Sequence, residues 1–120
     1  MIGVEFLLTL IVAHYVADFV FQTEKMATRK SYSVFWLTAH VVTYTTVLAI
    51  FTVWYWPMEY FIVWLLTNGI LHWFTDFTTS RLNAEYQKRG EVNAFWNCIG
   101  ADQAIHHACL VMTTYFFLIV

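Results

Sequence analysis

Apolar residues run along most of the chain in four long stretches, which shorter and more polar segments separate. A helix that crosses a bilayer needs about 20 mostly apolar residues. The stretches that reach this length are 2–23, 32–53, 58–79 and 95–118. Pro57 precedes the third stretch and suits a helix start, where its missing N–H is not needed. The pattern predicts an all-α fold in which residues 1–120 form one integral membrane domain, a four-transmembrane-helix bundle with short loops.

The positions of the basic residues predict an orientation for these spans. All six Lys and Arg residues lie in the connecting segments 24–31 and 80–94, and the connection at residues 54–57 has none. Cytoplasmic loops of membrane proteins carry the excess of Lys and Arg. We therefore expect segments 24–31 and 80–94 to be cytoplasmic and both termini to lie outside (N-out/C-out).

The composition supports lipid as the main partner of the surface. Hydrophobic residues make up 60% of the chain and charged residues 12%, whereas soluble domains carry about 25% charged residues. The net charge is −2 and there is no basic stripe, which argues against a nucleic-acid partner. Cys98 and Cys109 lie in one apolar stretch and form no CxxC pair, so no disulfide framework is predicted.

Ionisable and amide residues interrupt the apolar stretches at a helical spacing. They are His14, Asp18 and Gln22 in the first stretch, His40 in the second, Asn68, His72 and Asp76 in the third, and Asp102 and His106 in the fourth. Residues four apart share one helix face, and ionisable groups inside a membrane usually face the bundle interior. At a rise of about 1.5 Å per residue, all four spans bring these groups to one layer in the cytoplasmic half.

The residue types in this layer point to a divalent metal ion. Imidazole nitrogen and carboxylate oxygen without thiolate suit Zn, Mn or Fe. The predicted ligands of one ion or two are His14, Asp18, His40, His72, Asp76, Asp102 and His106. Such an ion lowers the pKa of bound water to about 7 and polarises a phosphoryl or carbonyl oxygen. Asp102 is also the candidate general base.

Other polar residues near the layer are expected to support it. Those predicted to hydrogen-bond the ligands or to orient a substrate are Gln22, Asn68, Gln103 and His107. Separately, Gly100, Ala104 and Ala108 form a ridge of small residues on the fourth stretch. Small residues at this spacing allow close helix packing, so the ridge predicts a contact either inside the bundle or between two copies in a homo-oligomer.

The polar residues lie in four motifs, which are HYVADFVFQ with MATRK following, a lone His in the second stretch, HWFTD and DQAIHH. With these motifs together, the chain resembles a small four-helix bacterial and phage inner-membrane family. That family is described only as a domain of unknown function, and the resemblance covers nearly the whole chain. More distantly, the chain is similar to LexA-regulated inner-membrane proteins labelled predicted metal-dependent hydrolases. The resemblance implies a multi-pass protein of the bacterial inner (cytoplasmic) membrane in which the same seven His and Asp residues matter.

Three functions are compatible with these observations. The leading hypothesis is a metal-dependent hydrolase that acts near the cytoplasmic leaflet on a phosphoester or a lipid. One alternative is a proton or divalent-cation conducting module, since Asp and His chains serve as relays in membranes. Another is a non-enzymatic phage or host effector that binds a further membrane protein. The cluster can also be purely structural, because polar side chains hydrogen-bond between membrane helices.

Overall fold

The computed structural model describes residues 3–119, which form helices and no strand. The elements are α1 (Val4–Tyr15), a π-helical turn (Val16–Val20), α2 (Glu24–Arg29), α3 (Val34–Thr52), a 3-10 turn (Val53–Tyr55), α4 (Met58–Lys88) and α5 (Val92–Ile119). The prediction of an all-α fold is confirmed.

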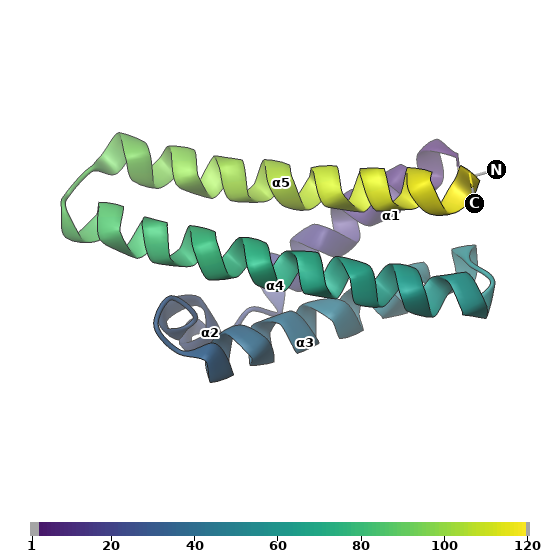
Figure 1. Ribbon diagram of the computed structural model, residues 1–120, viewed down its shortest axis with the longest axis horizontal. Coiled ribbons are helices and arrows are strands. Elements are labelled where there is room, and N and C mark those ends of the chain that lie inside the picture. The colour runs from purple at the N-terminus through teal and green to yellow at the C-terminus, as the bar shows by residue number, and fades with distance from the viewer. Residues whose placement is uncertain (1–2, 120) are drawn as a thin grey trace.

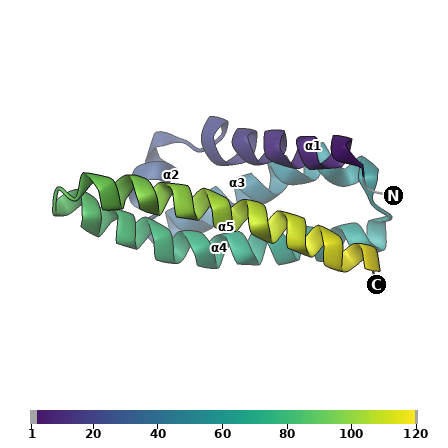
Figure 2. The ribbon, with the colours of Figure 1, turned by 90° about the horizontal axis from the view of Figure 1, so that it is seen from above.

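The four longer helices form an elongated bundle of 47 × 26 × 23 Å. Figure 1 shows α4 and α5 as a long antiparallel pair, with α3 lying along α4. Seen from above, α1 lies across from this pair and contacts both α3 and α5, and α2 lies toward the end that holds the α4–α5 turn (Figure 2). The start of α1, the end of α5 and the α3–α4 connection lie at the opposite end.

The predicted four-transmembrane-helix bundle is wrong. Among residues 3–119, one helix, Val34–Tyr55, is long and apolar enough to cross a membrane. The first apolar stretch is divided into shorter elements, of which α1 has 12 residues. Polar side chains along α4 and α5 keep these long helices below the hydropathy that a span requires. A single such helix supports association with a membrane. The predicted N-out/C-out orientation and multi-pass inner-membrane location depend on four spans, so the structure does not support them.

The predicted loops are shorter in the structure because helices extend into them. Segment 24–31 is mostly α2, which Thr23 caps by accepting a hydrogen bond from the Met26 N–H. Ser33 caps α3 in the same way through the Trp36 N–H. Both residues have the side-chain oxygen that satisfies a free N–H at a helix start. The basic residues of the first predicted loop are therefore held on or beside a helix that packs against α3.

The α4–α5 turn occupies only a few residues of the predicted loop 80–94. Gly90 has a φ of +68°, a conformation that glycine adopts most readily. Its N–H donates to the carbonyl of Gln87, and the Glu91 N–H donates to the carbonyl of Tyr86. These two bonds close the end of α4 in a Schellman motif and turn the chain directly into α5.

The apolar core lies at the end of the bundle that holds the α3–α4 connection. Phe6, Leu48, Trp64 and Leu110 are buried there, one from each long helix. Trp64 is the largest fully buried side chain, and its Nε1 donates to Thr114 Oγ1 at 3.1 Å. His14 and Asp18 are buried polar residues that follow Phe6 and Leu10 of this core along the chain.

The ridge of small residues does not pack inside this chain. Gly100, Ala104 and Ala108 are exposed, and a Cβ placed at Gly100 would have no neighbour within 4 Å. Packing within the bundle is therefore the wrong interpretation of the ridge. Contact between two copies stays a prediction.

Gly69 provides a test of the α3–α4 contact. A Cβ at this buried position would lie 2.9 Å from Thr45 Oγ1, so alanine requires Thr45 to shift. Replacing an exposed helical glycine by alanine stabilises by about 0.5–1 kcal/mol. We expect this gain for Gly100→Ala and not for Gly69→Ala, as measured by chemical denaturation. In a Gly69→Ala/Thr45→Ala variant the gain should return; an equal gain in both single variants would contradict the close approach.

Candidate metal centre

Four segments bring six of the predicted ligands together beside the apolar core. Asp18 comes from the π-helical turn, His40 from α3, His72 and Asp76 from α4, and Asp102 and His106 from α5. These six residues are called the His/Asp cluster below. Five of them are buried, and the Asp102 side chain keeps 13% of its surface exposed. Asp102 is therefore the member of the cluster most open to a ligand from outside.

One ligand set in the cluster has the spacing of a tetrahedral metal site. It consists of Asp18, His40, His72 and Asp76. The Nε2 atoms of His40 and His72 lie 3.2 Å apart. They lie 2.9 and 3.5 Å from Asp18 Oδ1, and 3.2 and 3.5 Å from Asp76 Oδ2. Four ligands at about 2.0 Å from a tetrahedral Zn²⁺ are themselves about 3.3 Å apart. The measured separations fit such an ion.

Hydrogen bonds within the protein do not satisfy this set. Asp18 Oδ1 is buried and receives no hydrogen bond of suitable geometry from the described residues. The facing nitrogens of His40 and His72 also cannot both place a proton in the 3.2 Å between them. Buried polar atoms are normally paired. The donor set and its unpaired oxygen therefore fit a divalent cation.

A second ligand set lies next to the first and shares Asp18 with it. The other members are Asp102 and His106, with His106 Nε2 3.2 Å from Asp102 Oδ1. His106 Nε2 also donates to Asp76 Oδ1 at 3.0 Å. Burial alone would lower the pKa of His106, but hydrogen bonds to Asp102 and Asp76 raise it to about 9. This set has three protein ligands, which leaves room for a fourth from outside.

The π-helical turn sets the position of Asp18. The Phe21 N–H bonds to the carbonyl of Val16, five residues earlier. Such single π turns inside helices are frequent at functional sites. The prediction of one regular helix over 2–23 is wrong at this point, because a π turn leaves no trace in a pattern of apolar residues.

His14 lies at the edge of the His/Asp cluster and belongs to neither ligand set. Its Nε2 donates to Gln103 Oε1 at 2.7 Å, which leaves Nδ1 to accept from the Tyr44 hydroxyl at 3.1 Å. Burial lowers the pKa of His14 to about 4, so the ring is neutral near pH 7. Both ring nitrogens are thus occupied, and His14 positions Gln103 in this structure.

Gln103 connects the acids of the cluster. Its Nε2 donates to Asp18 Oδ2 and to Asp102 Oδ2, each at 3.0 Å. His107 donates from Nδ1 to the main-chain carbonyl of Gln103 at 2.8 Å. Asn68 bonds instead to the Trp64 carbonyl and to Thr113. Of the predicted supporting residues, Gln103 contacts the ligands directly, His107 contacts Gln103, and no contact places Asn68 at the ligands.

Lys30 is a member of the site that the sequence did not reveal. Its Nζ donates to Asp76 Oδ2 at 2.8 Å, and 15% of its side chain is exposed. Burial alone would lower the pKa of Lys30, but Asp76 and Asp18 raise it above the usual value. Thr79 was also missed and donates to Asp102 Oδ1 at 2.6 Å. Lys30 follows α2 and Asp76 lies in α4, so no local spacing links them.

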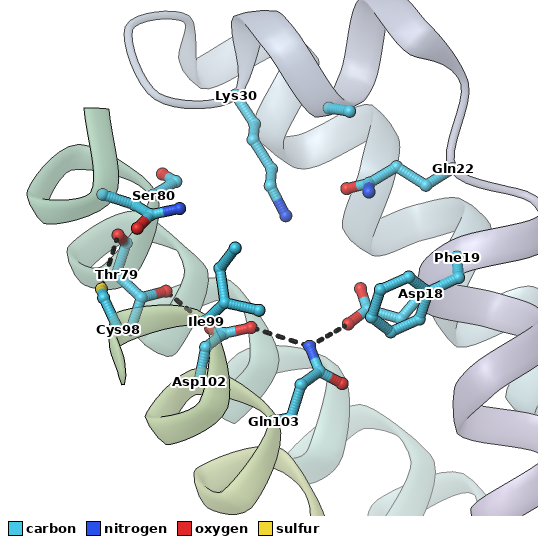
Figure 3. A pocket seen from close by; sticks show the side chains of 12 residues that line it. Asp18, Phe19, Gln22, Lys30, Thr79, Ser80, Cys98, Ile99, Asp102 and Gln103 are labelled. Carbon is cyan, nitrogen blue, oxygen red and sulfur yellow. Dashed lines mark hydrogen bonds between the residues drawn. The ribbon is translucent and has the colours of Figure 1, made fainter. Parts of the chain in front are cut away.

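A cavity of about 220 Å³ opens beside the cluster and is called the cleft below. Figure 3 shows Lys30 pointing into it from one side, with Asp18, Asp102 and Gln103 on the other. Gln22, Ser80 and Asn83 also line it, and an atom of each (Oε1, Oγ and Oδ1) is buried without a partner among residues 3–119. The cleft gives a ligand access to Asp18 and Asp102.

Comparison with known proteins places the chain in a family. No curated protein and no solved structure matches it. A family model described as "Protein of unknown function (DUF3307)" matches residues 6–120, which include every member of the His/Asp cluster. The chain therefore belongs to the DUF3307 family.

Proposed function

We propose that this protein binds divalent metal at the His/Asp cluster and hydrolyses a phosphoester or a lipid in the cleft. The observation that carries the proposal is the spacing of the donor atoms of Asp18, His40, His72 and Asp76, whose measured separations run from 2.9 to 3.5 Å. The residue types suit Zn, Mn or Fe. An ion there also offsets the burial of the Asp18 and Asp76 carboxylates, which is costly without a partner.

The two ligand sets suit different roles. Structural zinc sites use four protein ligands, whereas catalytic sites use three and keep one position open. The set of Asp18, Asp102 and His106 has three ligands, two of which line the cleft. A divalent ion in such a position supplies activated water and polarises a phosphoryl or carbonyl oxygen. We assign hydrolysis to this second set and a positioning role to the first. The role of Asp102 as a general base stays a prediction.

The arrangement favours this proposal over conduction of protons or cations. A conductor requires a polar path along the bundle. Polar contacts extend from Lys30 through the cluster to Gln103, His14 and Tyr44. Beyond Tyr44, the apolar core with Leu48 and Trp64 fills the bundle. The polar network thus ends inside the protein, whereas the cleft opens at the cluster.

The apolar surface suits action at a membrane. The helix Val34–Tyr55 has the length and composition of a membrane helix, and Phe35, Val42, Ile50 and Trp54 along it are exposed. An exposed apolar surface of this kind typically marks an interaction site. We therefore propose that the protein associates with lipid, and that the distant similarity to predicted metal-dependent hydrolases reflects a shared type of site.

Elemental analysis of the purified protein tests the metal centre. We expect a stoichiometric divalent metal in the wild-type protein and a strong loss in His72→Ala, because His72 supplies one of four ligands in the first set. Asp102→Ala removes a ligand from the second set alone. A fall from two ions to one in Asp102→Ala would show that each set holds its own ion.

His107→Ala is the matched control for these variants. His107 lies beside the cluster but bonds only to the Gln103 carbonyl among its polar contacts in the described residues, so this variant should keep its metal. Circular dichroism of each variant separates metal loss from unfolding. If gently purified wild-type protein carries no stoichiometric metal, or His72→Ala keeps all of it, the proposed metal centre is wrong.

A further inference from the structure

Lys30 and the metal ion compete for the same carboxylate oxygen. Asp76 Oδ2 accepts a hydrogen bond from Lys30 Nζ at 2.8 Å, and the same oxygen lies 3.2 and 3.5 Å from the Nε2 atoms of His40 and His72 in the first ligand set. An ammonium group and a divalent cation on one oxygen repel each other strongly in a buried site. Occupation of the first set therefore requires the Lys30 ammonium to leave Asp76.

The cleft is the space into which the Lys30 side chain can turn. Lys30 lines the cleft and also an adjoining cavity of about 280 Å³. Ala27, Ser80 and Asn83 line both cavities as well, so the two cavities lie next to each other at Lys30. A lysine side chain has a flexible stem and three donor hydrogens. Released from Asp76, its ammonium would face the cleft.

The walls of the cleft carry further groups in need of a partner. Ser80 Oγ, Asn83 Oδ1 and Gln22 Oε1 are buried and without a hydrogen bond among the described residues. Ser80 can donate a hydrogen bond, and the two amides can turn to present N–H₂ instead of oxygen. A cation, a hydroxyl and amides around one space are the groups that bind an oxyanion.

Size and charge narrow the class of ligand. The cleft volume of about 220 Å³ far exceeds the roughly 30 Å³ that one water molecule occupies in the liquid. Without an ion, the carboxylates of Asp18, Asp76 and Asp102 surround the single ammonium of Lys30 and oppose an anion. A divalent ion offsets two of these negative charges and so weakens their repulsion of an anion in the cleft.

We infer that Lys30, with the polar wall of Ser80, Asn83 and Gln22, binds the anionic phosphoryl group of the substrate once a divalent ion has displaced Lys30 from Asp76. This inference rests on the proposed metal centre and names the substrate class of that centre, a phosphate ester. Lys30 acts as the binding group for the phosphoryl oxygens, and the metal ligands stay on the other side of the cleft.

Calorimetric titration of methylphosphonate into the Zn²⁺-loaded protein tests the inference. We expect Lys30→Met to weaken binding by about tenfold or more, because a hydrogen bond from a charged group to an anion is lost. Lys25→Met, which changes an exposed lysine in α2, the helix that Lys30 follows, should stay within twofold. The Zn²⁺-free wild-type protein should bind as weakly as Lys30→Met. Titration with dihexanoyl phosphatidic acid distinguishes the sources: tighter binding indicates a lipid headgroup, and equal binding a free phosphate.

Zinc content, measured on the same samples, separates the two proposals. Equal affinities of wild type and Lys30→Met at full zinc occupancy overturn the role of Lys30 and leave the metal centre intact. Absence of bound zinc in the wild-type protein overturns both. If Lys30→Met does not fold, Ser80→Ala/Asn83→Ala replaces it: we expect at least threefold weaker binding, and unchanged binding overturns the polar wall as a phosphoryl site.

Discussion

Lys30→Met is expected to lower the free energy of unfolding of the metal-free protein by roughly 3 kcal/mol. The variant leaves the buried Asp76 carboxylate without the ammonium that lies 2.8 Å from it. Removing one partner of a buried ion pair is strongly destabilising because the other charge stays buried and unpaired. Chemical denaturation in the presence of a chelator, followed by tryptophan fluorescence, measures the loss.

A double-mutant cycle identifies Asp76 as the partner. Asp76→Asn removes the charge with little change in shape, so Lys30→Met should then cost about 1–3 kcal/mol less than in the wild-type background. Lys25→Met is the exposed control and should stay within about 0.5 kcal/mol of wild type. Adding Zn²⁺ should reduce the loss in Lys30→Met, because an ion in the first ligand set replaces the missing positive charge. Equal losses in Lys25→Met and Lys30→Met would contradict the buried pair.

The apolar pattern predicted where the helices lie, but it did not predict whether they face lipid or the interior of a bundle. The second and fourth stretches, 32–53 and 95–118, correspond closely to α3 (Val34–Thr52) and α5 (Val92–Ile119). The third predicted span ends at residue 79, where polar residues become frequent, although α4 continues to Lys88. Apolar side chains are needed both by a bundle core and by a lipid-facing surface, so counting them does not give the number of membrane spans.

The site was predictable where its geometry is local. His72 and Asp76 are four residues apart on one helix, as are Asp102 and His106, and this spacing alone places each pair on one face. His14 has the same spacing from Asp18, but its ring is held by Tyr44 and Gln103 from other helices.

Contacts between distant segments account for what was missed. Lys30 and Asp76 are 46 residues apart, and their contact depends on how α2 sits against the bundle. A basic residue in a polar segment carries no sign of such a contact. The cleft likewise arises only when α2, α4 and α5 come together, so the amides and hydroxyls that line it could not be grouped from the sequence.

Trp64→Ala is expected to lower the free energy of unfolding by about 3–5 kcal/mol. Trp64 has no exposed surface and packs against Phe6 and Trp56, with ring centroids 6.3 and 5.5 Å away. The substitution leaves a large cavity and removes the hydrogen bond from Nε1 to Thr114. Chemical denaturation measures the loss; Trp96→Ala, at a position 63% exposed, is the control and should change stability by less than about 0.5 kcal/mol.

Trp64→Ala also tests whether metal binding depends on the packing of the apolar core. Trp64 lies in the apolar core, and the metal ligands lie beyond Tyr44 toward the cleft. Under conditions in which Trp64→Ala is still folded, it should therefore bind as much metal as wild type, whereas His72→Ala should lose metal with a smaller loss of stability. A Trp64→Ala protein that is folded but metal-free would mean that the core positions the ligands, and equal destabilisation by Trp96→Ala would mean that the outer face is buried in an assembly or a bilayer.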